Sequence, residues 1–458
     1  MKQRRLSAML FGIALGLSTV QVSAETLASA MTAAYNNSNL LEQNRALLRS
    51  QDEGVAVALS ALRPQISGST SLTQGQTSSI GSSLSATVGL SVDVLLWDGG
   101  RSQLAVESAK ESVLAVRSQL VQQEQAVLLD TVNAYVQVLR DQRVLSLRQS
   151  NMRLITQELR AARDRFEVGE VTRTDVAQAE ARLAAARGDL ANAQGQLEIT
   201  RELYKIAVGR KASNLKQITS LPKLPKSLDA AKATARRINP RIDQIQHEIK
   251  ANELSYAATK ARTRPQLRAN GNLSHTNSNG VNDTTDSSSV GLTLSVPIYQ
   301  GGQLSALGRQ ALALVHASKA QLNQQVLAVD QGVANSWSQL AVARAQVTSS
   351  ERQIRAAQIA FDGVREEAKL GARTTLDVLD AEQDLSDART NFVVAQTQAY
   401  SAAYSVLASM GLLTADNLKL KVKRYDPTEY YNAVKDAPVP ITKSGKKLDR
   451  ILNRYQKN

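Results

Sequence analysis

The sequence has no cysteine, few aromatic residues and only one long apolar run, which lies at its N-terminus. The absence of Cys excludes disulfide bonds and thiolate metal sites, and it suits an oxidising envelope compartment. Aromatic residues make up 4% of the 458 positions, while Ala, Gln, Leu, Ser and Val dominate, a bias typical of long helices. After residue 24 no segment has the ~20 apolar residues of a membrane-spanning helix. We therefore expect any entry into a membrane to be as strands.

Signals for catalysis, metal binding and cofactors are also missing. His247, His275 and His316 are isolated and show no ligand spacing. There is no phosphate-binding loop and no nucleophile elbow. The formal net charge is +14, and a basic C-terminal tail could attract nucleic acid, but a secreted envelope protein rarely meets any. We predict no enzyme activity, no cofactor, no metal and no nucleic-acid partner, and a tail that is solvated or faces lipid headgroups.

The first residues have the order of a secretory signal. Lys2, Arg4 and Arg5 form a basic segment, Leu6–Leu17 is apolar, and Val22–Ala24 is a small-residue cleavage site. About 12 apolar residues are too few to span a bilayer. We predict a signal peptide over 1–24 and a mature chain that starts at residue 25.

Two stretches, which start at residues 169 and 371, match each other position by position at a constant offset of 202 residues. Gly169–Glu180 and Gly371–Glu382 share Gly, Thr, Asp, Val, Ala and Glu at equivalent positions. Gly169 and Gly371 supply the positive φ that stops a helix, and the Thr residues after them can cap the next helix. We predict two helix-to-helix turns in a duplicated structure.

The repeat covers most of the chain. Trp97-Asp-Gly-Gly100 matches Tyr299-Gln-Gly-Gly302, and the offset does not change up to the final Gly of each half. Long uninterrupted helices explain this, because one inserted residue would rotate everything beyond it by about 100°. We predict a first repeat over 25–226, a second over 227–412 and a basic tail over 413–458. The elements expected in the first repeat are strands at 65–73 and 84–97, a long helix at 101–166 and a returning helix at 172–208; those in the second are strands at 266–275 and 288–299, a long helix at 303–369 and a returning helix at 374–410.

The strands show strict alternation. From Leu84 to Leu96 every even position is apolar and the odd positions are mostly Ser, Thr, Gly or Asp. Two interpretations remain: an antiparallel sheet on a soluble core, or a membrane barrel with strands of ~9–11 residues. The barrel is favoured because no globular segment could cover a sheet, and because Trp97 and Tyr299 stand at equivalent strand ends, as interfacial aromatics do. Four strands cannot close a barrel, which needs about 8, so this interpretation predicts an oligomer.

The helices carry a heptad pattern. Val176, Leu183, Leu190, Leu197 and Tyr204 fall seven apart with small residues between them, and the second repeat has the same seam. This predicts a coiled-coil core in which helix backbones approach closely. A long helix of some 65 residues would be about 100 Å long, more than a compact domain needs.

Together, the signal peptide, the duplicated helix–strand–strand–helix plan, the Gly-Gly after the second strand and the Gly-x-x-Thr-x-x-Asp-Val turn resemble the TolC family of outer-membrane efflux and type I secretion channels. The resemblance covers essentially the whole mature chain. It implies a mainly α-helical homotrimer with a 12-stranded outer-membrane barrel, a long coiled-coil periplasmic tunnel, and an equatorial, partly disordered C-terminal tail. It also implies docking by a periplasmic adaptor and an inner-membrane pump, contact with outer-membrane lipid, and passive export.

Within the resemblance, Asp377 and Asp380 match the acidic residues at the periplasmic mouth of the family. The sequence itself places Asp377, Asp380, Asp384 and Asp387 in one stripe along a helix, and threefold symmetry would turn such a stripe into rings that select cations. The alternative is that Asp377 caps the helix with Thr374 while the other three form a solvated face.

The resemblance also implies a gate latch in which Arg373 ties the closed mouth to Thr174 and Asp175 of the first turn. A Tyr that shares this role in the family falls at Ala368, so part of the latch is missing or replaced. We predict an outer-membrane exit duct for type I secretion or multidrug efflux. The alternative is a non-conducting coiled-coil protein of the envelope, which would need no lipid-facing sheet.

Overall fold

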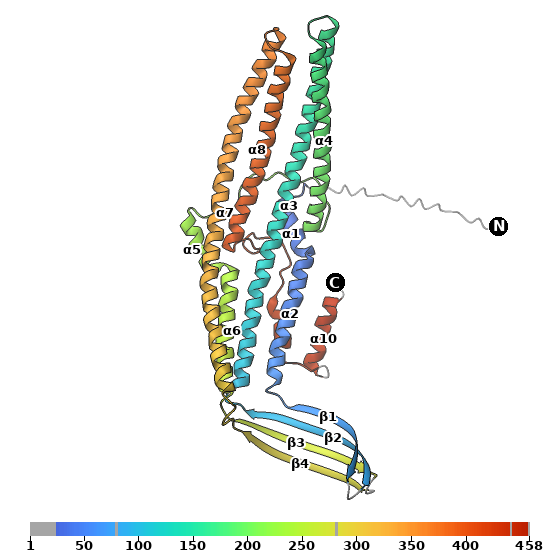
Figure 1. Cartoon of the computed structure of the whole chain (residues 1–458), viewed down its shortest axis with the longest axis vertical. Coiled ribbons are helices and arrows are strands. Elements are labelled where there is room, and N and C mark those ends of the chain that lie inside the picture. Colours follow the sequence, from blue (N-terminus) through green and yellow to red (C-terminus); the bar gives the residue numbers. More distant parts are fainter. Residues whose placement is uncertain (1–23, 78–80, 280–282, 440–441, 457–458) are drawn as a thin grey trace, which may run out of the picture.

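The computed structural model describes residues 24–77, 81–279, 283–439 and 442–456. The signal peptide predicted at 1–24 therefore lies outside the described residues, except for its last position. The chain forms a long rod (Figure 1), with a four-stranded sheet at one end and the turns of two helical hairpins at the other. We call these the sheet end and the hairpin end.

Two helices of 67 residues each run along the rod: α3, Arg101–Glu167, and α7, Gln303–Lys369. Their length is about 100 Å at 1.5 Å per residue. The returning helices α4, Arg173–Val208, and α8, Thr375–Met410, pack against α3 and α7. Most side chains of the α4 seam are buried, namely Ala179, Leu183, Ala186, Ala193, Leu197, Thr200 and Tyr204, whereas Val176 and Leu190 are partly exposed. No described helix is both long and apolar enough to cross a membrane.

The duplicated arrangement predicted from the sequence is confirmed, because both repeats have the same order of elements. Each repeat begins with a pair of shorter helices. In the first repeat these are α1, Leu27–Asn37, and α2, Asn39–Ser60; in the second they are α5, Leu228–Ile238, and α6, Pro240–Ala261. Helix α2 packs on α3, and α6 lies between α3 and α7. The contacts of α6 therefore join the two repeats along the lower half of the rod (Figure 1).

The four strands form one antiparallel sheet in the order β1-β2-β3-β4. The central pairing of β2 with β3 joins the two repeats, and in its register Ser91 lies opposite Asn272. Three strands are longer than the alternation predicted, because the Ser- and Thr-rich segments next to the hairpin loops also pair. The strands are β1, Gln65–Thr77; β2, Gly81–Trp97; β3, Gln266–Ser278; and β4, Asp283–Ser295.

The predicted end of the fourth strand is wrong. We expected 288–299, whereas β4 starts at Asp283 and ends at Ser295. Pro297 has no N–H to donate to a ladder and restricts the residue before it, so the alternation of Val296 and Ile298 does not extend the strand. The first repeat has Leu95 at the equivalent position, and β2 continues to Trp97 through an irregularity in its pairing.

The sheet joins the helices through glycines with positive φ. Gly100 and Gly302 precede the first residues of α3 and α7 with φ of 84° and 83°, a conformation that glycine adopts without strain. At Gly99 a Cβ would lie 2.5 Å from the side chain of Arg264, whose guanidinium donates to the Gly99 carbonyl at 2.6 Å. Arg264 is followed by Pro265, as Arg63 is followed by Pro64 in the first repeat, so the Arg-Pro pair before β3 of the second repeat holds the Gly-Gly pair after β2 of the first.

The described part of the predicted basic tail, 413–458, contains two helices: α9, Pro427–Val434, and α10, Lys443–Gln456. The partly disordered state expected for the tail stays a prediction. Helix α9 packs against α2, where the hydroxyl of Tyr430 donates to Glu53 Oε1 at 2.6 Å. A repeat-based reading of the sequence has no counterpart for these helices, because the tail is not part of the duplication.

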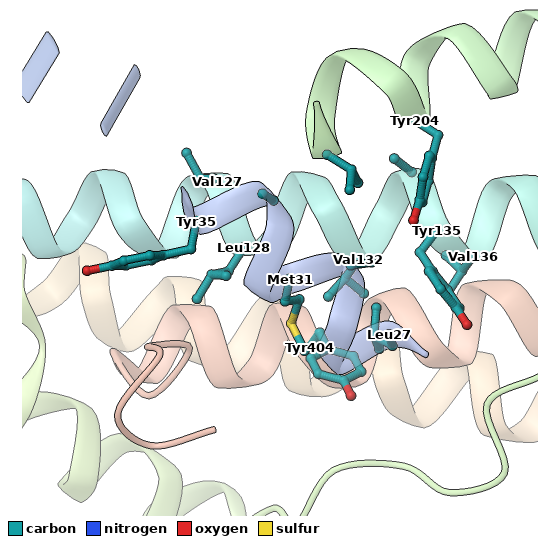
Figure 2. Packing of buried hydrophobic residues seen from close by; sticks show 14 of the residues in the cluster. Leu27, Met31, Tyr35, Val127, Leu128, Val132, Tyr135, Val136, Tyr204 and Tyr404 are labelled. Carbon is teal, nitrogen blue, oxygen red and sulfur yellow. The ribbon is translucent and has the colours of Figure 1, made fainter. Parts of the chain in front are cut away.

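The largest buried cluster lies at mid-height, where α1 crosses α3 and the end of α4 (Figure 2). Tyr135 and Tyr204 are completely buried in it, with ring centroids 6.4 Å apart. Both hydroxyls donate hydrogen bonds to Glu25: Tyr135 donates to the Glu25 carbonyl at 2.8 Å, and Tyr204 donates to the Glu25 carboxylate at 2.7 Å. Arg210 completes the carboxylate's environment with a contact of 2.6 Å. Glu25 is thus a buried charge with partners, the condition under which such a charge is tolerated.

We predict that Tyr204→Phe destabilises the fold, because it removes a hydrogen bond to a buried carboxylate that water cannot replace. The expected loss in unfolding free energy is about 1–3 kcal/mol, measured from thermal unfolding followed by circular dichroism. Tyr256→Phe on α6 is the matched control, since the described contact of Tyr256 is made by its ring. Equal melting temperatures for the two variants would contradict the assignment.

Candidate functional site

The two turns at the hairpin end have the same backbone. Gly169 and Gly371 have φ of 81° and 76°. In both turns the N–H after the glycine donates at 2.9 Å to a carbonyl five residues earlier, the pattern of a helix that ends on a left-handed residue. Positive φ at both positions closes α3 and α7 so that α4 and α8 can return.

Each returning helix starts with a reciprocal cap. In the second repeat, the N–H and the hydroxyl of Thr374 donate to Asp377 Oδ2 at 2.9 and 2.8 Å, and the Asp377 N–H donates back to the hydroxyl at 3.2 Å. Thr172 and Asp175 repeat this geometry in the first. The hydrogen bonds from Thr374, the backbone one foremost, hold the pKa of Asp377 below its usual value. Asp377 therefore does cap α8, and its exposed carboxylate keeps its charge.

Two further members of the acidic stripe, Asp380 and Asp387, face cations from the first hairpin. Asp380 Oδ1 pairs with Arg182 of α4, and Asp387 lies 3.7 Å from Arg148 of α3. Arg148 is also 3.7 Å from Asp189 of α4. Within one chain the stripe thus holds the two hairpins together, a role that the sequence analysis did not assign to it.

Two of the three residues predicted to form the gate latch, Asp175 and Arg373, line the same groove. This groove of about 730 Å³ lies between the two turns, and Asp175, Arg373 and Asp377 are among its lining residues. Within the chain, Arg373 Nε donates to Glu367 Oε2 at 2.9 Å rather than to the first turn. Thr174 is exposed and does not line the groove.

Ala368, at the position of the family's Tyr, lies inside the second hairpin. It is buried with Phe361, Val378 and Leu385, where a methyl group fits between the two helices. The position has no hydroxyl, so any hold between the turns of this protein has to come from other side chains.

One such contact was missed by sequence reasoning. Asn151 of α3 and Glu382 of α8 are both buried, and the Asn151 amide donates to Glu382 Oε2. Burial raises the pKa of Glu382 to about 7, opposed by Arg389, by the bond from Asn151 and by Arg148, while Asp387 adds to the rise. The equivalent residue of the first repeat, Glu180, is half-exposed and pairs with Arg163. No signal in the sequence separates these two glutamates.

Apolar packing accompanies these polar contacts. Leu379 of α8 is buried among side chains of the first hairpin, including Ile155 and Leu183, and Leu154 of α3 packs on the cluster inside the second hairpin. The two hairpins are thus joined near their turns by apolar side chains as well as by Asn151, Arg148 and Arg182.

At the sheet end the two faces differ in chemistry. Residues opposite each other on paired strands share a face, and the register aligns Ile66, Val92, Gly271 and Val290 in one row across all four strands. This apolar face has nothing packed over it: Val290 is 92% exposed. The opposite face carries hydrogen-bonded hydroxyl pairs between strands: Ser67 with Ser91, Thr87 with Thr276, and Ser274 with Ser287.

The two predicted interface aromatics lie where the sheet meets the helices. Trp97 is the last residue of β2, and Tyr299 follows the end of β4; their exposed fractions are 50% and 85%. Among the described residues there is no group of three or more His, Asp or Glu side chains placed to hold a metal ion.

We predict that the contact at Glu382 depends on pH. The ordinary pKa of a glutamate carboxyl is 4.5, and burial raises the pKa of Glu382 in the folded protein to about 7, so between these pH values the folded state keeps a proton that the unfolded state loses. Stability should therefore fall as pH rises through this window, by one to a few kcal/mol at about 1.4 kcal/mol per pKa unit. Glu382→Gln should remove the slope, measured as the melting temperature against pH, whereas Glu180→Gln should leave it unchanged. A slope that survives Glu382→Gln would contradict the assignment.

Comparisons with known proteins agree on one family. The family model described as "Outer membrane efflux protein" matches residues 30–208 and 233–412. The outer membrane efflux protein BepC of Brucella suis is 37% identical over 421 residues, which cover 90% of this chain and 91% of that protein. The outer membrane protein TolC of Escherichia coli is 27% identical over 359 residues, which cover 69% and 70%.

The solved structure of the CmeC outer membrane channel of Campylobacter jejuni has the same fold, with a TM-score of 0.74 at 15% identity. The match covers 95% of this chain and 98% of that one. The resemblance read from the turn and strand-end motifs is thus confirmed: the chain belongs to the outer membrane efflux protein family, whose members include TolC.

Proposed function

We propose that three copies of the chain close their sheets into one twelve-stranded barrel in the outer membrane and bundle their helices into a periplasmic tunnel. As a member of its family the protein is an outer-membrane efflux or secretion channel, not an enzyme. The observation that carries the proposal is the sheet, which has one exposed apolar face, one hydroxyl-lined face and two open edges.

The open edges require further copies. Among the described residues β1 pairs only with β2, and β4 only with β3, so their outer backbone groups have no partner within one chain. In lipid, backbone groups without partners are not tolerated and spanning sheets are closed. Strands of 13 and 17 residues exceed the ~9–11 that a tilted spanning strand needs. The apolar face would meet lipid and the hydroxyl face would line the pore.

The mouth of the channel is proposed at the hairpin end. Three copies would bring together three Asp377 and three Asp380 side chains, whose charges favour cations. Arg373, Thr174 and Asp175 remain the proposed latch, supported by the groove in which Arg373 and Asp175 meet. Because Arg182 of the same chain pairs with Asp380, we propose that the capping Asp377 dominates the selectivity of the ring.

The partners follow from the family, which forms trimeric tripartite export complexes. We propose a periplasmic adaptor and an inner-membrane pump, driven by ATP or by protons, that supply the energy, with Trp97 and Tyr299 at the lipid interface. A non-conducting envelope scaffold is the poorer explanation, because it does not explain why the sheet has an exposed apolar face.

We predict cation-selective conductance of the purified protein in planar bilayers, with a separable contribution from each aspartate. Asp377→Asn keeps a side-chain oxygen that can accept the hydrogen bonds from Thr374 but removes the charge, so it should reduce selectivity strongly. Asp380→Asn should reduce it less, and Arg182→Gln should increase it by releasing the Asp380 charge.

Glu198→Gln on α4 is the matched control, because Glu198 is an exposed carboxylate that pairs with Arg201 of its own helix and belongs to neither the proposed ring nor the proposed latch, so this variant should leave selectivity unchanged. If Asp377→Asn, Asp380→Asn and Arg182→Gln all leave the selectivity unchanged, the proposed acidic ring is contradicted, whereas the proposed pore is not. Inserted, folded protein that does not conduct would contradict the channel itself.

A further inference from the structure

The last helix of the chain has a basic face with no role in the fold. Lys443, Lys446, Lys447 and Arg450 are exposed and lie at i, i+3, i+4 and i+7, so they share one side of α10. None of the four makes an ion pair with a described residue. A row of cations without acidic partners repels itself, and an anionic surface would relieve that repulsion.

The apolar side of the helix fixes its orientation. Leu448 and Ile451 are buried against Tyr430 and Val434 of α9, and α9 is in turn held on α2 by the bond from Tyr430 to Glu53. With its apolar side already covered inside the chain, α10 can present only its charged side to a partner.

The basic face starts close to the sheet. The guanidinium of Arg63, two residues before β1, donates to the carbonyl of Ala437 at 2.7 Å and to that of Asp436. The N–H of Thr442 donates to the carbonyl of Val439 at 2.9 Å, and α10 begins at Lys443. Six residues span at most ~20 Å. Figure 1 shows α10 running away from the sheet beside α2.

We propose that the basic face of α10 binds the anionic phospholipid headgroups of the periplasmic leaflet of the outer membrane. This inference rests on the proposed insertion of the sheet, which sets the height of the bilayer surface beside Arg63. Lys side chains reach toward headgroups on flexible stems, and basic residues beside an anionic leaflet attract it strongly enough to act as an anchor. Three copies would place three such helices around the tunnel, with their first turns nearest the barrel, and this would fix the depth of the barrel in the membrane.

The test uses the absence of cysteine, which makes a single introduced thiol unique. A spin label at Ser444→Cys, between the lysines, is compared with one at Ser349→Cys, an exposed position on α7 about 70 Å along the helix from the sheet. The full protein is inserted into nanodiscs of phosphatidylcholine with or without phosphatidylglycerol. A headgroup-attached paramagnetic lipid should relax the label at residue 444, more strongly with phosphatidylglycerol, and should not affect the label at residue 349.

The second variable is charge. The triple variant Lys443→Gln/Lys446→Gln/Lys447→Gln should abolish the effect of phosphatidylglycerol on the relaxation of the label at residue 444. It should also lower the affinity of the protein for phosphatidylglycerol on the order of 100-fold, at roughly fivefold per basic residue. The matched control is the replacement by Gln of three exposed lysines at mid-height, Lys211, Lys223 and Lys226, which gives the same net charge and should leave binding unchanged.

Relaxation that is equal with and without phosphatidylglycerol would overturn the lipid proposal. So would binding to purified peptidoglycan that the triple variant loses while phosphatidylglycerol has no effect, since the face would then serve the cell wall. Failure to enter nanodiscs at all would instead contradict the membrane insertion of the sheet, so the two proposals fail in different ways.

Discussion

Backbone hydrogen bonding at the edges of the four-stranded sheet is the constraint on which the rest of the structure depends. One chain satisfies the inner strands through β1–β2, β2–β3 and β3–β4 pairing and leaves the outer sides of β1 and β4 open. In lipid, closure by other copies would satisfy these edges, as proposed above. Closure would then place the long helices side by side in a ring, because short connections that end in Gly100 and Gly302 lead from β2 to α3 and from β4 to α7.

Duplication gives the two hairpins the same backbone but different charges. The caps at Thr172 and Thr374 are alike, whereas the position of Asp384 in the second repeat is Arg182 in the first. Because of that difference, Arg182 can pair with Asp380 across the two hairpins. If residue 182 were Asp, as at the equivalent position 384, two negative charges would meet at the contact with Asp380 and weaken it.

Local signals account for what could be predicted from the sequence. Glycine at a left-handed position, a Thr-x-x-Asp cap and alternation along a strand each act within a few residues, so the turns at Gly169 and Gly371 and the sheet could be recognised. The end of β4 was overestimated because the alternation continued through Pro297, whose backbone restriction was not given weight. Helices α9 and α10 were missed because nothing in the repeat corresponds to them.

Contacts between hairpins could not be predicted, because they depend on which helix faces which. Glu180 and Glu382 occupy equivalent positions with the same residue type, yet one side chain is half-exposed and the other is buried beside Asn151. The burial of Ala368 likewise follows from the packing of α8 on α7 and not from local spacing.

Closure by neighbouring copies can be tested at a single pair of residues. In the β2–β3 register Ser91 lies opposite Asn272. The repeat equates Ser91 with Thr293 on β4 at the offset of 202, and Asn272 with Ser71 on β1 at an offset of 201, the distance between the Arg-Pro pairs that precede β1 and β3. The same pairing between copies would place Thr293 opposite Ser71 of the next copy, at a Cβ distance of about 5 Å. Within one chain β1 and β4 are three strand spacings apart, about 14 Å, which is too far for a disulfide.

The most direct measurement is therefore disulfide formation in Ser71→Cys/Thr293→Cys, a protein with no other cysteine, analysed on non-reducing denaturing gels after membrane insertion. The proposed assembly predicts a covalent band of three chains that reduction returns to one, and no such band from either single variant. A double variant that is inserted and conducting but stays monomeric on the gel would contradict closure of β4 on β1 in this register.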